Sequence, residues 1–561
     1  MWALYQDDKI VPPLLYSNEK GQDQVVREIV ELFDSYDVVF LQGAVGTGKS
    51  AIALMVANEL NGGIVVVPTK TLQQQYVKDY CKQGRYKILK KDGGWLRIEL
   101  IKGRGNFRCL YDPEVTCNDR KLPCVAPLHD DLSRVEMAKE CDYYSPVIHS
   151  KLEKKYCEEL DCRFETLHYE AVGGLFSVLR RNEEICPYYQ QYCNAYVYAD
   201  VVLMNSAIWE IETLILKRKP VKPVEIIDEG DAFLDNLTLR KAISLRTIKR
   251  LEKKLGKDTP ENIEKKFYEI KKNFLEITSK DYEGEIKGEQ VSFLKEFTNF
   301  LEAMGEDNSY MDIFQFINEC FVSVKKERIE YFIPEPEKVL KELLKLSANK
   351  VLFMSATFQS QEVLENVFGL DNYCFVEGET KFPGTVYPKQ LGTESRVTYR
   401  NWKYEEFRQR YWQNLTEAIK QSSKPCLVTV HAFKYLPENF CERLKGRQTL
   451  RTKNGDITFS TVMKRGVDLK DDRCRSIVML KFPFPDMNDP ILKAMKLKLG
   501  DKVFWQYYHD VAEREFIQTL GRGVRHSDDW VELWSPDKSV FGYLKSLWRG
   551  NIKEKVEKEV A

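Results

Sequence analysis

The glycine-rich segment Gly43-Ala-Val-Gly-Thr-Gly-Lys-Ser50 is the part of the sequence most clearly suited to chemistry. It fits the pattern G-x-x-x-x-G-K-[ST], follows the apolar run 37–43 and precedes the helix-compatible run 51–60. In such a loop the backbone N–H groups wrap phosphates, the lysine reaches the β- and γ-phosphates, and the serine hydroxyl binds Mg²⁺. The segment predicts a nucleoside triphosphate site formed by Gly43, Gly46, Thr47, Gly48, Lys49 and Ser50.

Two further groups of residues fit phosphoryl chemistry. Asp228 and Glu229 follow a short apolar run, and such a pair holds Mg²⁺ through water and orients or deprotonates the attacking water. Far downstream, Arg522 and Arg525 are three residues apart and share one helix face, where their guanidinium groups suit developing charge on a γ-phosphate. We therefore expect hydrolysis of the nucleotide, assisted by arginine fingers from a second domain.

Eight of the 14 cysteines crowd into residues 109–193. They are Cys109, Cys117, Cys124, Cys141, Cys157, Cys162, Cys186 and Cys193. Thiols stay reduced in a cytoplasmic chain, so this density indicates metal binding rather than disulfides. Four thiolates can hold a 4Fe-4S cluster. Zinc is the alternative metal, because His129, His149 and His168 lie close by in sequence and zinc accepts mixed cysteine and histidine ligands.

Two α/β sheets are expected to position these residues. The runs 37–43, 63–69, 199–205, 224–228 and 351–357 are almost continuously apolar, as are strands buried on both faces of a parallel sheet. A second set begins at Cys426 and continues through 457–462, 476–481 and 530–534. The chain therefore divides near residue 385 into two sheet domains.

Two stretches interrupt the succession of apolar, strand-like runs, and we interpret them as insertions into the first sheet domain. Residues 102–195 carry the cysteines, and residues 241–345 are rich in Lys and Glu with an amphipathic helical pattern. That pattern consists of Ile263, Phe267, Ile270, Phe274 and Ile277.

Composition excludes some classes of protein. The 561 residues are 43% hydrophobic and 30% charged, with 85 Lys+Arg against 85 Asp+Glu, which argues against disordered and collagenous chains. No apolar run approaches the ~20 residues of a membrane helix, and the N-terminus lacks a basic start followed by an apolar core. We expect a cytoplasmic enzyme, nucleoid-associated in a prokaryote, with no membrane partner.

The zero net charge conceals one basic strip. Residues 82–108 hold nine Lys and Arg against Asp92 and Glu99, a local net charge of +7, interleaved with Tyr86, Trp95 and Phe107. Basic and aromatic side chains together suit phosphate neutralisation and base stacking on a single strand. A solvated basic face is the alternative interpretation.

Taken in order, these segments resemble the XPD/DinG-type helicases of superfamily 2 over most of the chain. The matching pieces are Gln22, GAVGTGKS, VVVPTKTLQQQ, KGRGNFRC, CPYYQQ before ADVVLMNSAIW, DEGD, MSAT, RGVDL, KFPFPDMNDP and QTLGRGVR. The resemblance implies two RecA-like motor domains, with an iron-sulfur domain and a helical arch domain inserted in the first. It also implies 5′ to 3′ translocation on single-stranded DNA and unwinding of duplexes.

The resemblance assigns roles residue by residue. Gln22 would contact adenine, Lys49 and Ser50 the phosphates and Mg²⁺, and Asp228 and Glu229 the metal and water. Asp468 would couple the domains, and Gln518, Arg522 and Arg525 would contact the γ-phosphate. The cluster ligands would be Cys109, Cys124, Cys141 and Cys186, with Cys117 the alternative to Cys124, and Cys157 or Cys162 the alternative to Cys141.

Two positions depart from the family pattern. Relatives mostly carry Asp-Glu-Ala-His at the acidic motif, whereas Gly230 and Asp231 follow Glu229 here. Asp231 can accept a hydrogen bond from Gln518 or from the segment 355–357. Arg465 stands where many relatives have an acidic residue.

These observations give a domain plan. Motor domain 1 comprises residues 1–101, 195–240 and 346–385, interrupted by an iron-sulfur domain at 102–194 and a helical arch domain at 241–345, and motor domain 2 comprises 386–561. We expect a monomeric ATP-dependent DNA helicase acting on single-stranded and forked DNA, in repair or replication. The alternatives are a nucleic-acid-binding scaffold with weak motor coupling and a helicase that tracks along RNA.

Overall fold

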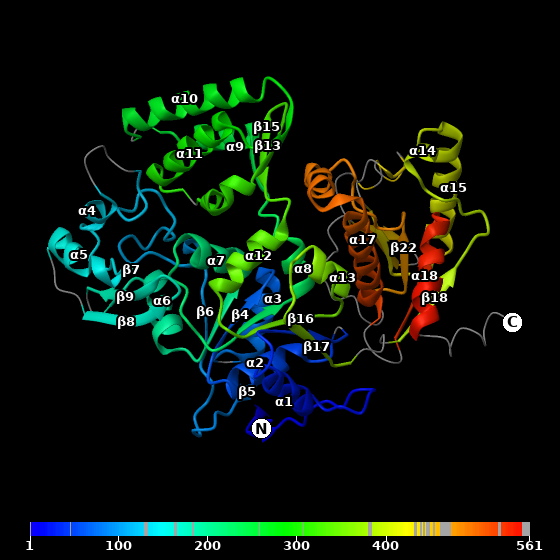
Figure 1. The fold of residues 1–561 in the computed structure, drawn as a ribbon, viewed down its shortest axis with the longest axis horizontal. Coiled ribbons are helices and arrows are strands. Elements are labelled where there is room, and N and C mark those ends of the chain that lie inside the picture. The colour runs from blue at the N-terminus through cyan, green and yellow to red at the C-terminus, as the bar shows by residue number, and fades with distance from the viewer. Residues whose placement is uncertain are drawn as a thin grey trace.

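The computed structural model describes residues 2–551, with the exception of 45, 83, 128–132, 162–164, 182–183, 257–258, 307, 380–383, 431–434, 438–439, 441, 443, 445–448, 453–454, 461–472 and 525–528. Two large sheets lie side by side, and two smaller bodies stand beside the first of them (Figure 1). Within the described residues no helix combines the length and apolar character that crossing a membrane requires.

The first sheet has seven strands, and every neighbouring pair is parallel. Their spatial order is β17 (Tyr373–Glu377), β3 (Val38–Gln42), β16 (Val351–Ser355), β11 (Glu225–Asp228), β4 (Gly63–Val67), β10 (Val201–Asn205) and β6 (Ile98–Leu100). Alternate side chains enter two cores, because Val39 and Leu41 pack with α1 (Gln22–Leu32) and α2 (Lys49–Glu59) whereas Val38 and Phe40 face the opposite layer. All five strands predicted for this domain are confirmed.

The second sheet has six strands, parallel except for its last pair. The order is β18 (Thr385–Lys389), β23 (Trp530–Trp534), β22 (Ser476–Met479), β19 (Cys426–Thr429), β21 (Gly455–Ser460) and β20 (Thr449–Thr452). The helices α14 (Tyr399–Trp402), α15 (Glu405–Gln421), α17 (Pro490–Gly523) and α18 (Lys538–Asn551) accompany it. The predicted pair of α/β parallel sheets is thus confirmed.

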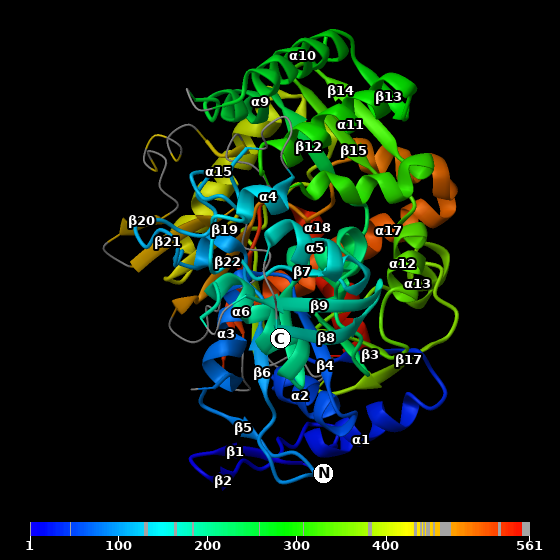
Figure 2. The same cartoon turned by 90° about the vertical axis from the view of Figure 1, so that its left-hand side faces the viewer.

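The cysteine-rich segment builds a small antiparallel sheet of β7 (Val147–His149), β9 (Gly174–Arg180) and β8 (Glu165–Ala171). Short helices α4 (Arg134–Ala138), α5 (Glu153–Leu160) and α6 (Pro187–Tyr192) complete it. Figure 2 shows this segment on the near side of the molecule, below the helices of residues 241–345.

Residues 241–345 contain more than helices. The amphipathic pattern correctly predicts α10 (Glu261–Ile277), whose Ile263, Phe267, Ile270 and Phe274 are buried. The other helices are α9 (Leu245–Glu252), α11 (Gly288–Ala303) and α12 (Pro336–Lys345). A four-stranded antiparallel sheet accompanies them, in the order β12 (Lys241–Ser244), β15 (Arg328–Phe332), β14 (Phe321–Lys325) and β13 (Tyr282–Glu285). The expectation of a purely helical segment was incomplete.

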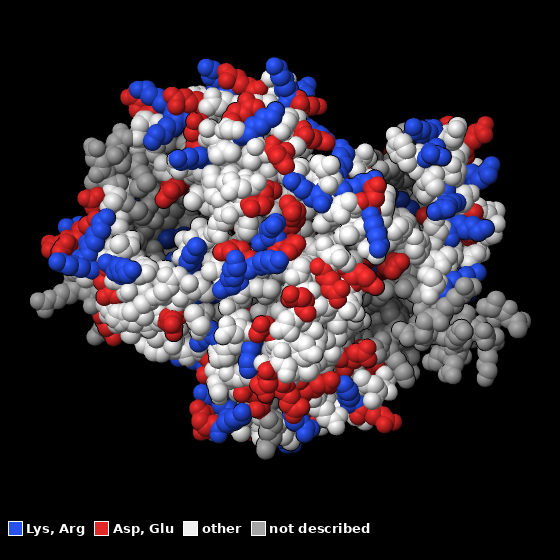
Figure 3. All heavy atoms as spheres, viewed as in Figure 1, with Lys and Arg blue, Asp and Glu red and all other residues white. Residues whose placement is uncertain are grey.

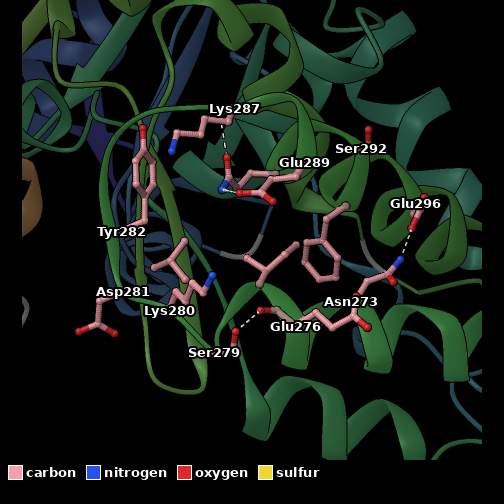
Figure 4. Close-up of a pocket in the computed structure, with 14 residues that line it drawn as sticks. Asn273, Glu276, Ser279, Lys280, Asp281, Tyr282, Lys287, Glu289, Ser292 and Glu296 are labelled. Carbon is pink, nitrogen blue, oxygen red and sulfur yellow. Dashed lines mark hydrogen bonds between the residues drawn. The ribbon is translucent and has the colours of Figure 1, made fainter.

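An open groove of about 540 Å³ lies between α10, α11 and β13 (Figure 4). Its lining is mostly polar and charged, and its apolar members are Ile277, Phe293 and Val324. The remaining strands, β1 (Leu4–Gln6), β2 (Lys9–Ile10) and β5 (Lys87–Ile88), form a small sheet near the N-terminus. Acidic and basic side chains intersperse over the face seen in Figure 3, in keeping with the zero net charge.

Candidate functional site

The phosphate loop connects β3 to the first turn of α2. Gly46 and Gly48 have φ of +83° and +76°, which only glycine adopts without strain. The Lys49 Nζ donates hydrogen bonds to the carbonyl oxygens of Gly43 (2.7 Å) and Ala44 (3.1 Å), and the Thr47 hydroxyl donates to Ala44 at 2.7 Å. The loop thus follows a strand and precedes the N-terminus of α2, the position from which backbone N–H groups bind phosphates.

Gln22 is the first residue of α1, and its side chain forms hydrogen bonds with the backbone of the phosphate loop. Its Nε2 donates to the carbonyl oxygens of Thr47 (3.2 Å) and Gly48 (3.4 Å), and its Oε1 accepts from the Leu14 N–H at 2.9 Å. The Tyr16 hydroxyl donates to the same Thr47 oxygen at 2.8 Å, and burial raises the pKa of Tyr16 to about 12. The structure thus gives Gln22 a role in fixing the loop, and its adenine contact stays a prediction.

Asp228 ends β11 and is buried beside the loop. Burial raises the pKa of its carboxyl, and the positive charge of Lys49 opposes that rise, so the two predicted residues lie within electrostatic reach of each other. The Tyr76 hydroxyl donates to Asp228 Oδ2 at 2.8 Å and also lies beside Ser50. Glu229 follows in the left-handed region, with φ +56°.

Tyr76 was not among the predicted site residues. It belongs to α3 (Lys70–Tyr80), is 1% exposed and contacts the residues expected to bind Mg²⁺. The signal in the sequence was the matching segment VVVPTKTLQQQ, which ends immediately before it.

Gly230, one of the two departures from the family pattern, has a steric cause. It begins α8 (Gly230–Asp235), where an added Cβ would stand 2.9 Å from Phe353 Cβ and 3.2 Å from Phe358 Cε1. The helix therefore packs directly against β16, with no room for the Cβ of an alanine.

Replacing Gly230 with alanine should destabilise the protein. The forced shift between α8 and β16 should lower the free energy of unfolding by roughly 1–3 kcal/mol. Denaturant or thermal unfolding measures it, with Gly288→Ala, where an added Cβ meets open space, as the matched control. Equal stability of the two variants would contradict the packing described.

Asp231 joins the two sheets. Its Oδ1 accepts from the Ser355 hydroxyl at 2.7 Å and its Oδ2 from Thr357 at 3.4 Å, while Gln518 Nε2 donates to the same Oδ2 and to Thr357 Oγ1 at 3.0 Å. The carboxylate is fully buried. Both hydrogen-bond partners expected for Asp231 are therefore present, and Gln518 reaches the first sheet from α17.

Arg522 follows Gln518 by one helical turn, so the two share a face of α17. It is 6% exposed, and its neighbour Gly523 packs against Ile477 and Val531 of the second sheet. Arg525, Asp468, Arg465, Cys162 and His129 lie outside the described residues. Their roles stay predictions.

Five thiols line one narrow cavity in the cysteine-rich segment. They are Cys109, Cys117, Cys124, Cys141 and Cys186. The set contains the four expected ligands and the alternative Cys117, whose Sγ lies 3.7 Å from Cys186 Sγ. Cys193 is buried but does not line this cavity, and neither does Cys157.

The donor set of this cavity fits an iron-sulfur cluster. A hydrogen bond from the Cys117 thiol lowers the pKa of Cys186, which favours the thiolate that metals bind. Within the described ranges, no three Cys, His, Asp or Glu side chains gather tightly enough to hold one metal ion. In a 4Fe-4S cluster each thiolate binds a different iron, so its ligands need not converge on one point.

Arg104 corrects the expectation of a single basic strip. Its guanidinium turns into the cysteine cavity, donates to the Tyr189 hydroxyl at 2.9 Å and to Cys124 Sγ at 3.5 Å, and stacks on Tyr188. The Arg104 side chain is only half-buried, but its donors point at Tyr189 and Cys124, so it is poorly placed to contact a DNA backbone. Burial raises the pKa of Cys124, and the charge of Arg104 opposes that rise.

The rest of the strip is divided and partly paired. Lys82 and Arg97 pair with Glu99, Lys90 with Asp92 and Asp200, and Lys91 with Glu59. The β5 part lies beside the N-terminus, whereas residues 102–109 lead into the cysteine-rich segment on the other side of β6 (Figure 1). The basic strip is therefore split between two different parts of the molecule.

Comparisons with known proteins agree with this architecture. Residues 398–549 match the helicase C-terminal domain family. An XPD helicase structure superposes with a TM-score of 0.59 at 17% identity, covering 94% of this chain and 98% of the other. Xpd4 of S. tokodaii gives 0.51 at 12% identity, covering 95% and 98%.

Curated relatives match over a shorter length. The ATP-dependent DNA helicase CHL1 of Kluyveromyces lactis is 22% identical over 182 residues, which are 29% of this chain and 21% of that protein. CHL1 of Eremothecium gossypii is 21% identical over 164 residues, covering 26% and 20%. The chain thus aligns with about a fifth of the length of these relatives.

Proposed function

We propose that this chain is an ATP-dependent DNA helicase of the XPD/DinG type, because its fold superposes on an XPD helicase structure and its residues 398–549 match the helicase C-terminal domain family. The observation that carries the proposal is the junction at the acidic motif. There β11 ends at Asp228, whose carboxyl lies within electrostatic reach of Lys49, and three residues later Asp231 accepts a hydrogen bond from Gln518 of α17. Hydrolysis at the loop is thereby linked to movement of the second sheet.

Each residue of the candidate site has a proposed role in ATP binding or hydrolysis. Lys49 and the backbone of the loop bind the phosphates, Ser50 and Asp228 hold Mg²⁺, and Tyr76 orients Asp228. Bound Mg²⁺ would neutralise phosphate charge. Glu229 orients the attacking water, and Arg522 and Arg525 approach the γ-phosphate from the second sheet. As these arginines bind and release the γ-phosphate, the two sheet domains move along a single DNA strand. The 5′ to 3′ direction of this movement is taken from the family resemblance.

The cysteine cavity holds the proposed 4Fe-4S cluster through Cys109, Cys124, Cys141 and Cys186. Bound there, the cluster would cross-link chain segments far apart in sequence and keep this body rigid. Such a rigid body, together with residues 241–345 as an arch, would split a duplex as the strand is drawn past it.

Two alternatives have distinct consequences. A scaffold with weak motor coupling is the first alternative, and against it stands the hydrogen bond that Gln518 of α17 donates to Asp231, a direct link between the two sheet domains. A helicase that tracks along RNA is the second alternative, and comparing the stimulation of ATP hydrolysis by DNA and RNA oligomers of equal length distinguishes the two.

We expect ATP hydrolysis to be stimulated by single-stranded DNA more than by RNA of equal length and sequence. We also expect displacement of strands from 5′-tailed but not 3′-tailed duplexes, by a brown preparation that contains iron. Phosphate release, gel-resolved strand displacement and iron analysis on one preparation measure all three. Absence of stimulation by either nucleic acid would support the scaffold, and a colourless protein retaining zinc would rule out the cluster.

A further inference from the structure

Two helices meet across the junction between the sheets through complementary polar faces. On α17, Asp510, Arg514 and Gln518 recur every four residues and so share one face. On α8, Asp231 and Asp235 have the same spacing. Helix α13 (Gln361–Asn366), which follows β16, also packs on α17 (Figure 1).

Arg514 lies at the centre of this contact. Its NH1 and NH2 donate to the two oxygens of Asp235 at 2.8 and 3.0 Å, a bidentate pair between residues 279 positions apart. Its Nε donates to Asp510 Oδ1 at 2.6 Å, and its NH1 lies 3.8 Å from Asp231 Oδ2. The side chain is 6% exposed, so solvent screens these interactions little.

The surrounding bonds extend the contact into the first sheet. The other Asp510 oxygen accepts from the Ser360 N–H at 2.7 Å. Gln359 Nε2 donates to the Asp231 carbonyl at 3.0 Å and to Asp235 Oδ1 at 3.1 Å. The guanidinium therefore stands among three carboxylates that both sheets contribute.

The charges make closure of the junction depend on Arg514. Without it, Asp231 and Asp235 would face Asp510 across a largely buried contact with no cation between them in the described network. Like charges at low dielectric repel strongly, and a buried charge deprived of its partner is costly. The open arrangement, in which water reaches these carboxylates, would then be favoured.

We propose that Arg514 is a positioning residue for ATP hydrolysis, which acts by holding α8 and the second sheet together in the closed state. Helix α8 begins directly after Glu229. The bidentate bond of Arg514 to Asp235 therefore fixes the segment that carries the water-orienting carboxylate of Glu229. Arg514 itself touches neither nucleotide nor metal in this proposal. The inference rests on the proposed ATPase function and names the residue pair that couples its two sheets.

The test compares Arg514→Gln, Arg514→Lys, Asp235→Asn and the double variant Asp235→Asn/Arg514→Gln. Arg514→Gln should lower the DNA-stimulated kcat roughly tenfold or more while KM for ATP changes little, because the phosphate loop is untouched. Arg514→Lys, which keeps the charge, should recover part of the loss. The double variant should be no worse than Arg514→Gln, since the two residues act as one pair.

Arg475→Gln is the matched control, because Arg475 forms a comparably buried pair with Asp529 at 3.0 Å within the second sheet alone. It should cost stability without the selective loss of kcat. A wild-type kcat in Arg514→Gln, multiplicative losses in the double variant, or parallel losses of kcat and nucleotide affinity in both arginine variants would each overturn the proposal.

A second readout separates this inference from the proposed function. Small-angle scattering with a non-hydrolysable ATP analogue should show compaction of the wild-type protein and of Arg475→Gln, but not of Arg514→Gln. Equal compaction of all three would overturn the inference even if the helicase assignment holds. If the wild type and Arg475→Gln compact, Arg514→Gln does not, and nucleic acid fails to stimulate hydrolysis, the helicase assignment is overturned and the role of Arg514 in closure is supported.

Discussion

Replacing Lys49 with alanine should reduce ATP hydrolysis at least about a hundredfold, with or without DNA, because a preorganised cation aimed at the transferred phosphoryl group contributes on that scale. The Lys49 Nζ is held at the loop by the carbonyl oxygens of Gly43 and Ala44. Its charge also opposes the rise in the pKa of Asp228 that burial causes. The variant therefore loses phosphate binding and favours protonation of the acidic residue expected to hold Mg²⁺. Phosphate release under saturating ATP measures the effect.

Lys20→Ala is the matched control for this experiment. Lys20 precedes α1 in the same lobe and pairs with Glu28 at 2.8 Å, with both side chains more than a third exposed. Its removal should leave hydrolysis close to the wild-type rate, because an exposed pair contributes little. Substantial hydrolysis by Lys49→Ala would contradict the assignment of the loop as the nucleotide site.

The strands that the sequence predicted and those that it did not predict occupy different positions in the two large sheets. Runs such as 37–43 and 224–228 became central strands, buried on both faces and therefore continuously apolar. Within the two large sheets, the missed strands β6, β17, β18 and β20 are all sheet edges. An edge strand has a neighbour on one side only, and β17 and β18 are largely half-buried or exposed, so no continuous apolar run marks them.

In the candidate site, residues that are neighbours in the sequence could be predicted, whereas contacts between residues far apart in the sequence could not. The phosphate loop and the acidic pair are readable because each function is carried by adjacent residues whose spacing is itself the signal. Tyr76 and Asp228 are 152 positions apart, and Arg514 and Asp235 are 279 apart. Such pairs form only when strand order and the docking of the two sheets are known. Arg104 illustrates the opposite error, since its charge suggested a surface role while its actual neighbours are Tyr188, Tyr189 and Cys124.

Cys109→Ser should abolish strand displacement while leaving much of the ATP hydrolysis. Cys109 is 6% exposed in the cavity with the other expected ligands, and a serine there would not supply the thiolate that iron requires. The cysteine-rich segment stands apart from the phosphate loop, which is built on β3 and α2 (Figure 1). Loss of the cluster should therefore disorganise the body that splits the duplex and spare the nucleotide site. Iron content, strand displacement and phosphate release measured on one preparation separate these effects.

Two further cysteines sharpen the experiment. Cys193→Ser is the matched control, because Cys193 is equally buried in the same segment but lies outside the cavity, and it should keep both iron and unwinding. Cys117→Ser tests the fifth thiol, which contacts Cys186 but is not among the proposed ligands, and it should also retain iron. Loss of iron in Cys117→Ser with retention in Cys124→Ser would move the ligand assignment to Cys117. Wild-type unwinding by an iron-free Cys109→Ser would instead contradict the role of the cluster in splitting the duplex, because the motor would then need no rigid body at that point.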